Sequence, residues 1–147
     1  MYKRTAEGLR LLLVHPGGPF WAKKDASAWS IPKGEYGDGE DPLTVARREF
    51  AEELGHAPQA KAPAEPWPLG ELVQHGRKVV TAWALEGDLD VGTVTSNTFE
   101  IEWPPKSGRR QAFPEVDRAE WFTPEEARTR ILPGQEPFID RLLERLA

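Results

Sequence analysis

Thirteen glycines and fourteen prolines are spread over the 147 residues of this chain and divide it into short segments. Because proline interrupts helices and sheets and glycine is typical of turns, we expect short elements joined by shaped loops. The longest apolar run, residues 11–14, is far too short to cross a bilayer. At 16.5 kDa the chain has the size of one ordinary domain, so we expect a single domain over residues 1–147.

Composition and charge exclude several functional classes. With 39% hydrophobic and 29% charged residues, and without an apolar leader, the chain is expected to be a cytoplasmic globular protein with no membrane partner. The chain has no cysteine, so disulfides, a thiol nucleophile and cysteine-bound zinc are excluded, and any metal must be held by oxygen. The net charge of −5 argues against a nucleic-acid partner, since sequence-independent binding needs a basic face. The sequence leaves open whether the chain is a monomer or a homodimer.

Hydrophobic periodicity and turn residues predict interleaved strands and helices. The expected strands are a hairpin at 1–4 and 9–15, a short strand at 29–31, a second hairpin at 69–74 and 78–85, and strands at 97–103 and 120–122. Helices are expected after Asp41 and after Thr123, and an amphipathic helix is expected at the C-terminus. This order gives the α/β or α+β class, with a mixed β-sheet between helices.

The helix after Asp41 carries a cluster of acidic residues before Gly55 stops it. Glu49, Glu52 and Glu53 recur at i, i+3 and i+4, so they share one face. Glutamates on a helix are usually solvated side chains on an exposed face, so an exposed face without a bound ion is one interpretation of this pattern. Three like charges this close repel one another unless a positive charge lies among them. A hard cation such as Mg²⁺, which prefers carboxylate and phosphate oxygens, is the candidate.

The spacing of residues in KGEYGDGEDPLTVARREFAEELGH (33–56) distinguishes these alternatives, because it resembles the Nudix box, the signature of the Nudix hydrolase superfamily. A random match to its required residues has a chance on the order of one in a million at average residue usage. One position departs from the pattern, since His56 stands where an aliphatic packing residue is usual. The seven required positions are occupied by Gly34, Glu40, Arg48, Glu49, Glu52, Glu53 and Gly55.

The resemblance implies a mixed sheet flanked by helices and the hydrolysis of a pyrophosphate bond with Mg²⁺ or Mn²⁺. Carried over to this sequence, the metal ligands are Glu49, Glu52 and Glu53. Glu52 or Glu53 also activates water, and the resemblance leaves open which of them is the base. Arg48 corresponds to the arginine that orients a box glutamate, a role that suits its guanidinium fork.

Three residues before the acidic helix are assigned further roles. Gly34 is expected to bend the loop and let the backbone approach the metal or phosphate, with a plain turn glycine as the alternative. Glu40 is expected to tie the loop to the helix. The segment WSIPKG (29–34) resembles the entry to the box in dinucleoside polyphosphate and diphosphoinositol polyphosphate hydrolases. This likeness makes Lys33 a phosphate contact, and a solvated lysine is the alternative.

The segment PEVDRAEWFTPEEA (114–127) resembles the Nudix region that carries a further acid, so Glu115 is nominated as an extra metal ligand or base. The identity of a fourth ligand stays open, because Glu100, Glu102 and Glu120 compete with it.

Basic and aromatic residues precede Glu115. The basic residues are Lys106, Arg109 and Arg110, and a basic loop near the downstream acid suits the distal phosphates of a long polyphosphate. Trp103 and Phe113 are candidates for stacking a base, with core packing as the alternative.

We expect a small-molecule nucleotide as substrate, most of all a dinucleoside polyphosphate such as diadenosine tetraphosphate, cleaved to ATP and AMP. The alternatives are a nucleoside triphosphate pyrophosphohydrolase, since residues 15–35 also resemble a bacterial group of that type, and a catalytically silent nucleotide-binding module. The intact box disfavours the silent module. The roles of three histidines stay open, although His15 and His56 are expected at the surface or in packing; the third is His75.

Overall fold

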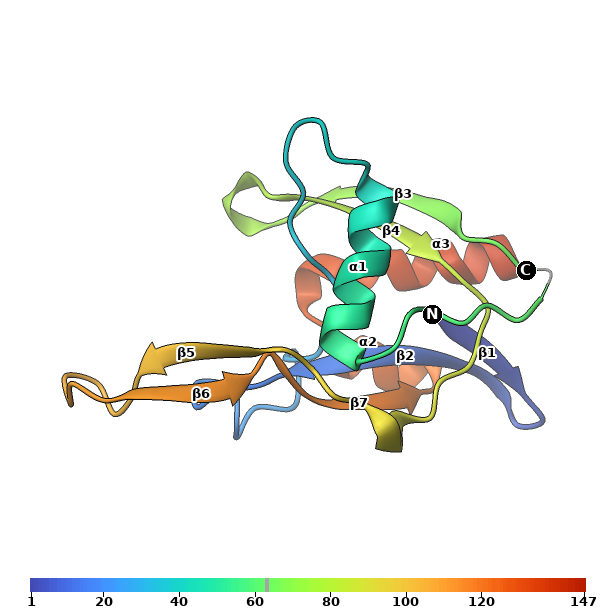
Figure 1. Cartoon of the computed structure of the whole chain (residues 1–147). Coiled ribbons are helices and arrows are strands. Elements are labelled where there is room, and N and C mark those ends of the chain that lie inside the picture. The colour runs from blue at the N-terminus through green and yellow to red at the C-terminus, as the bar shows by residue number, and fades with distance from the viewer. Residues whose placement is uncertain (63) are drawn as a thin grey trace.

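A computed structural model describes residues 1–62 and 64–147, with the side chain of His75 outside the described part (Figure 1). Three short 3₁₀ helices lie at 75–77, 91–93 and 133–135. The strands and α-helices are β1 (Tyr2–Thr5), β2 (Gly8–Pro16), α1 (Pro42–Leu54), β3 (Trp67–Val73), β4 (Val79–Ala84), β5 (Thr98–Glu102), β6 (Arg110–Pro114), β7 (Val116–Phe122), α2 (Pro124–Arg130) and α3 (Glu136–Leu146).

The strands form three small antiparallel sheets, in the orders β1-β2-β7, β3-β4 and β5-β6. A parallel bridge between Tyr2 and Glu86 joins the edge of the first sheet to the chain that follows β4. Both predicted hairpins are present, and the α+β class is confirmed. The expected strand at 29–31 is reduced to two isolated bridges, from Trp29 to Ile131 and from Ser30 to Val14.

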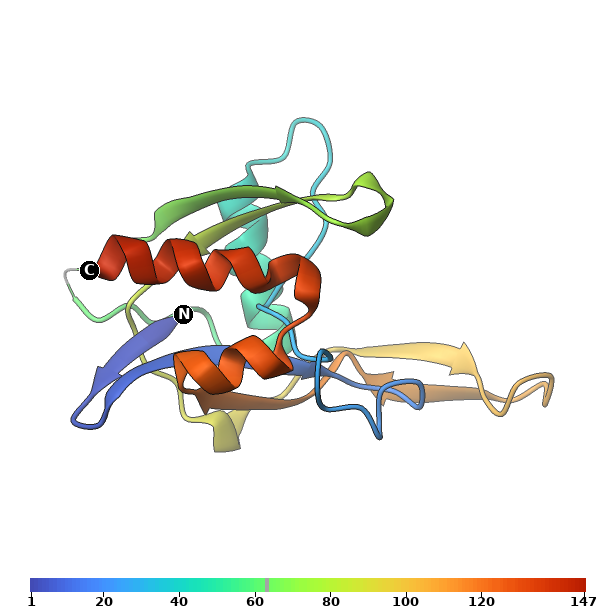
Figure 2. The same ribbon diagram turned by 180° about the vertical axis from the view of Figure 1, so that it is seen from behind.

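Strand β2 lies at the centre of the core because both of its faces are buried. Its residues alternate between two apolar clusters, as the two-residue period of a strand requires. Leu11 and Leu13 pack with Trp29 toward α2 and α3, whereas Leu12 and Val14 pack beneath α1. The views from front and back place α1 and α3 on opposite sides of the molecule (Figures 1 and 2).

Local signals set both ends of α1. The Asp41 carboxylate accepts hydrogen bonds from the Thr44 N–H at 3.2 Å and from the Thr44 hydroxyl at 2.7 Å, and Pro42 opens the first turn. At the other end Gly55 takes a φ of 80°, which favours glycine, and donates its N–H to the carbonyl of Ala51. The helix predicted from the sequence is confirmed between these two caps.

Strands β5 and β6 form a hairpin, residues 98–114, which we call the arm and which extends away from the rest of the molecule (Figure 1). The sequence did not predict β6, because Arg110 to Pro114 has neither an apolar alternation nor a β-branched residue. The loop after β2 runs along the arm: the Gly17 N–H donates to the carbonyl of Glu115 at 3.0 Å, and a side chain at Gly18 would meet the ring of Phe99.

None of the helices in residues 1–62 and 64–147 is long and apolar enough to span a membrane.

We expect Leu12→Ala to destabilise the protein by about 2–5 kcal/mol, because it removes a buried side chain and leaves a cavity under α1. Urea denaturation measures the loss. Val73→Ala is the control, since Val73 is 71% exposed, and its cost should stay within about 0.5 kcal/mol. Equal costs for the two variants would contradict the central place of β2.

Candidate active site

The acidic face of α1 is made by Glu49, Glu52 and Glu53, which differ in burial. Glu53 is buried with 7% of its surface exposed, whereas Glu49 and Glu52 are partly buried. The helix presents them because Phe50 and Leu54, on its apolar side, are buried in the core beneath it. The three acids therefore lie at the edge of the core, where charge is costly.

Burial raises the pKa of Glu53 to about 7, the largest of several influences on this carboxyl. The positive charge of Lys33 and the Lys33 N–H, which lies 3.3 Å from Glu53 Oε2, oppose the shift. Repulsion from Glu49 and Glu115 adds to it. Two of the acids chosen from the sequence thus act electrostatically on a third, although Glu115 is far from α1 in the chain.

Glu49 is held in a space that only glycine leaves open. A Cβ built at Gly34 would overlap the Glu49 carboxyl group. Burial raises the pKa of Glu49, and repulsion from Glu52 and Glu115 adds to this shift, whereas Arg48 lowers the pKa. The backbone of Gly34 has no positive φ, so the structure explains this glycine by the close approach of Glu49 to the loop.

The guanidinium group of Arg48 makes weak ion-pair contacts with three carboxylates. Its guanidinium nitrogens are 3.6 Å from Glu40, 3.8 Å from Glu49 and 3.9 Å from Glu52. Such half-exposed pairs contribute little to stability, and they place a positive charge beside these acids. Glu40 also accepts the N–H of Gly37 at 3.0 Å, so it connects the loop to the helix as expected.

The acidic face suits a divalent cation by its donors and its charge. Its carboxylate oxygens are the ligands that hard cations prefer. Burial, with repulsion between the carboxylates, raises the pKa values of Glu49 and Glu53, and a nearby cation opposes both effects. In the described part of the chain, no three acidic, histidine or cysteine side chains are already gathered around one point. Rotation of these glutamate side chains is therefore needed before they can share an ion.

A cavity of about 600 Å³ lies beside the acidic face, against the N-terminal half of α1. Lys33 and Gly34 form part of its wall, so the residues that contact Glu53 and Glu49 also border the cavity. Its volume is in the usual range for small-molecule sites. A second cavity, of about 140 Å³, lies in the apolar core and borders none of these acids. The larger cavity is lined mainly by Ile31, Pro32, Tyr36, Val45, Ala46, Gln74, Lys78, Val79, Val80, Thr81 and Trp83.

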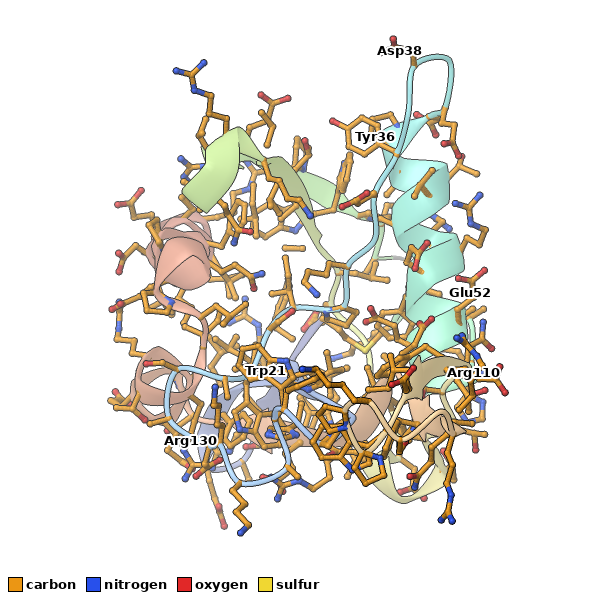
Figure 3. The ribbon with its side chains drawn as sticks, turned by 90° about the vertical axis from the view of Figure 1, so that its left-hand side faces the viewer. Trp21, Tyr36, Asp38, Glu52, Arg110 and Arg130 are labelled. Atoms are coloured by element: carbon orange, nitrogen blue, oxygen red, sulfur yellow. The ribbon has the colours of Figure 1, made fainter. Side chains whose placement is uncertain are left out.

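Two aromatic residues of this cavity were not predicted from the sequence. The hydroxyl of Tyr36 lies 3.3 Å from the hydroxyl of Thr81, which joins the loop before α1 to β4. Figure 3 shows Tyr36 near the N-terminal end of α1, with Glu52 further along the helix. Trp83 lies in the predicted strand at 78–85, on β4. Neither residue has a local signal, because the cavity is formed by segments distant in the chain.

The basic and aromatic residues predicted near Glu115 are not brought to the acidic face. The hairpin pairs Thr98 with Pro114 next to Glu115, so its turn, with Lys106, lies at the far end. Arg110 contacts Glu100 within the arm at 3.7 Å. The expected proximity was wrong because β6 is a strand, and each residue of a strand extends the chain by about 3.3 Å. The residues carried outward are Trp103, Lys106, Arg109 and Arg110.

The acids that competed with Glu115 lie elsewhere. Glu100 pairs with Arg110 in the arm, Glu120 lies 3.9 Å from Arg118 on β7, and Glu102 ends β5. Of these four acids, Glu115 alone is among the charges that act on both Glu49 and Glu53. Its electrostatic influence on these two acids therefore favours Glu115.

Two histidines pack as expected. His15 is fully buried, and its ring nitrogens contact Asp117 Oδ1 at 2.7 Å and the carbonyl of Lys24 at 2.6 Å. His56 contacts the hydroxyl of Thr93 at 2.9 Å. The side chain of His75 lies outside the described residues.

We expect the stability gained by Glu53→Gln in metal-free protein to depend on pH. Below about pH 4.5 Glu53 is neutral in both states, whereas between 4.5 and 7 the unfolded state ionises first, so rising pH removes stability from the wild type. The stability difference between variant and wild type should rise by about 3 kcal/mol from pH 4.5 to pH 8. Urea denaturation in the presence of a chelator measures this difference in the free energy of unfolding. A difference that stays constant with pH would contradict a raised pKa of the buried Glu53 carboxyl group.

Comparison with known proteins identifies the family. The NUDIX domain model matches residues 2–142, which is nearly the whole chain. The search of curated proteins gave no significant match. Solved structures, in contrast, share the fold over 99% of this chain.

Three of these structures illustrate the likeness. The C. elegans Ap4A hydrolase in a binary complex is 20% identical, with 92% of its chain covered and a TM-score of 0.66. The MutT protein from Methanosarcina mazei Go1 is 18% identical, with 90% covered and a TM-score of 0.59. The NUDIX domain of Shewanella oneidensis NrtR, complexed with ADP ribose, is 17% identical, with 83% covered and a TM-score of 0.56. At these identities the likeness shows the fold, and the family model over residues 2–142 shows that the chain belongs to the NUDIX domain family, which confirms its assignment to the Nudix hydrolases.

Proposed function

We propose that this protein hydrolyses a pyrophosphate bond in a nucleotide with the help of Mg²⁺, which Mn²⁺ can replace. One observation carries the proposal: the acidic face of α1, with Glu53 buried among other carboxylates, adjoins a cavity of small-molecule size through Lys33 and Gly34. A buried acid among other carboxylates beside a cavity is typical of a site for a cation and a phosphorylated ligand.

The proposed roles follow from the position of each residue. Glu49, Glu52, Glu53 and Glu115 would hold the cation, which supplies positive charge to the phosphate oxygens and acidity to a bound water. Glu52 or Glu53 takes the proton of the attacking water as its oxygen bonds to phosphorus, and the bond from phosphorus to the leaving phosphate oxygen breaks.

The remaining residues of the site position these groups. Arg48 places its positive charge beside Glu49 and Glu52 through contacts of 3.8 and 3.9 Å. Gly34 leaves space for the Glu49 carboxyl group. Lys33 lines the cavity next to Glu53, so its ammonium can contact a phosphate while its N–H holds the acid.

Within this activity, a dinucleoside polyphosphate such as diadenosine tetraphosphate is the proposed substrate. The segment WSIPKG contributes Ile31, Pro32 and Lys33 to the cavity wall, where Tyr36 and Trp83 supply aromatic surface for a nucleoside. The fold shared with the C. elegans Ap4A hydrolase agrees with this choice. A cytoplasmic location and the absence of nucleic-acid and membrane partners stay predictions.

A nucleoside triphosphate is the second candidate substrate, because the cavity beside α1 has room for one nucleoside and adjoins the acids through Lys33 and Gly34. Such an enzyme would release pyrophosphate and a nucleoside monophosphate. A catalytically silent binding module is disfavoured, since the acids and Arg48 are all present.

Chromatography of the products distinguishes these functions. Purified protein with Mg²⁺ should convert diadenosine tetraphosphate to ATP and AMP faster than it consumes any nucleoside triphosphate. Release of pyrophosphate from a preferred triphosphate would support the second candidate. Absence of hydrolysis across these nucleotides with both Mg²⁺ and Mn²⁺ would support the binding module.

We expect Glu52→Gln or Glu53→Gln to lower kcat by about 10²–10⁴ while the fold is kept, because one of these carboxylates accepts the proton of water and both would hold the cation. Steady-state kinetics and circular dichroism measure the two properties. Glu125→Gln is a matched control, since Glu125 lies exposed in the first turn of α2. Unchanged rates in both variants would refute the mechanism.

A further inference from the structure

We propose that the far end of the arm, with Phe20 and Trp103, binds the second nucleoside of a dinucleoside polyphosphate. This inference rests on the proposed function, and it assigns the specificity for a substrate with two nucleosides to residues far from the acidic face. Phe20 in particular has no signal in the sequence, because its place on the arm depends on the path of the loop after β2.

The acidic face lies between two surfaces that could hold the two ends of such a ligand. The cavity borders the N-terminal half of α1. The base of the arm is attached to the other end of the helix, where the N–H of Asn97 donates to the carbonyl of Glu52 at 2.8 Å. Figure 3 shows Tyr36 at the N-terminal end of α1, opposite to the end at which Asn97 is attached. A phosphate chain on the acids can therefore continue in both directions.

An aromatic pair lies at the outer end of the arm, where Phe20 is exposed and Trp103 is partly buried. Phe20 is 62% exposed and packs edge-on against Trp103, with 5.5 Å between ring centroids and an angle of 80° between their planes. The loop that carries Phe20 is fixed on the arm by the Gly17 N–H and by the contact of Gly18 with Phe99. Exposed aromatic rings held in place in this way are typical of ligand sites, because every nucleobase can stack on them.

Positive charge accompanies this pair. The N–H of Trp103 donates to the carbonyl of Arg109 at 2.9 Å, so the two residues oppose each other across the hairpin and their side chains share a face. Lys106 lies in the turn between them. In residues 1–62 and 64–147, the side chains of Lys106 and Arg109 form no ion pair, so both charges are free to face a phosphate.

The distance from the base of the arm to the aromatic pair suits a ligand with a nucleoside at each end. Glu115 lies opposite Asn97, since its N–H donates to the Asn97 carbonyl at 2.8 Å. Six residues of extended chain separate Asn97 from Trp103, which corresponds to about 20 Å. A mononucleotide whose nucleoside fills the cavity ends at the acids. Only further phosphates and a second nucleoside extend from the acids to the aromatic pair.

The test compares two substrates that differ by one nucleoside, diadenosine tetraphosphate and adenosine 5′-tetraphosphate, in the wild type and in Phe20→Ser. We expect the variant to raise KM for diadenosine tetraphosphate about tenfold with kcat retained, because a stacking surface is lost. KM for adenosine 5′-tetraphosphate should not change, since its one nucleoside occupies the cavity and it has no second nucleoside to bind the arm. Phe20→Tyr should retain the wild-type KM for both substrates.

Val73→Ser is the control, because Val73 is also an exposed apolar residue but lies on the β3-β4 hairpin. It should leave both KM values unchanged. An equal change for both substrates in Phe20→Ser, or no change for diadenosine tetraphosphate, would overturn the role of the arm while the proposed function stands. If the wild type hydrolyses neither substrate, the proposed dinucleoside polyphosphate hydrolase activity is overturned instead.

Discussion

The packing of the loop at Lys33 and Gly34 against the acidic face of α1 is the contact on which the candidate site depends. The Lys33 N–H reaches the buried Glu53 carboxyl group, and the missing side chain of Gly34 leaves the space that Glu49 fills. Both contacts hold carboxyl groups in a place where burial disfavours their charge. The same two loop residues form the wall of the larger cavity, so the acids and the cavity are parts of one surface.

Electrostatics gives this surface its chemical character. The chain carries a net charge of −5, yet its proposed ligand is an anion. Burial raises the pKa of Glu49 and Glu53, and repulsion from neighbouring carboxylates adds to the shift. A divalent cation would turn this repulsive cluster into an attractive one for phosphate. Lys33 at the cavity and the basic residues of the arm place the positive charge of the protein on either side of the acids.

Much of the helix that carries the site could be predicted, because its signals are local. Asp41, Pro42 and Gly55 fix the ends of α1 through capping and a left-handed φ, and the spacing of Glu49, Glu52 and Glu53 alone puts them on one face. The arm could not be predicted in this way. Its second strand, β6, has no apolar alternation and forms by pairing with β5. Because this strand was not predicted, the predicted position of the basic residues near Glu115 was wrong.

The sequence by itself determined the NUDIX box, the order of the main elements and the residue types for a cation site, because each depends on residues close together in the chain. Tertiary structure decided which downstream acid acts on the box glutamates, that Tyr36 and Trp83 share a cavity, and that Phe20 packs on Trp103. These contacts join segments that are tens of residues apart. Their partners are fixed only when the buried faces of β2 and α1 pack in the core, and no local pattern encodes that packing.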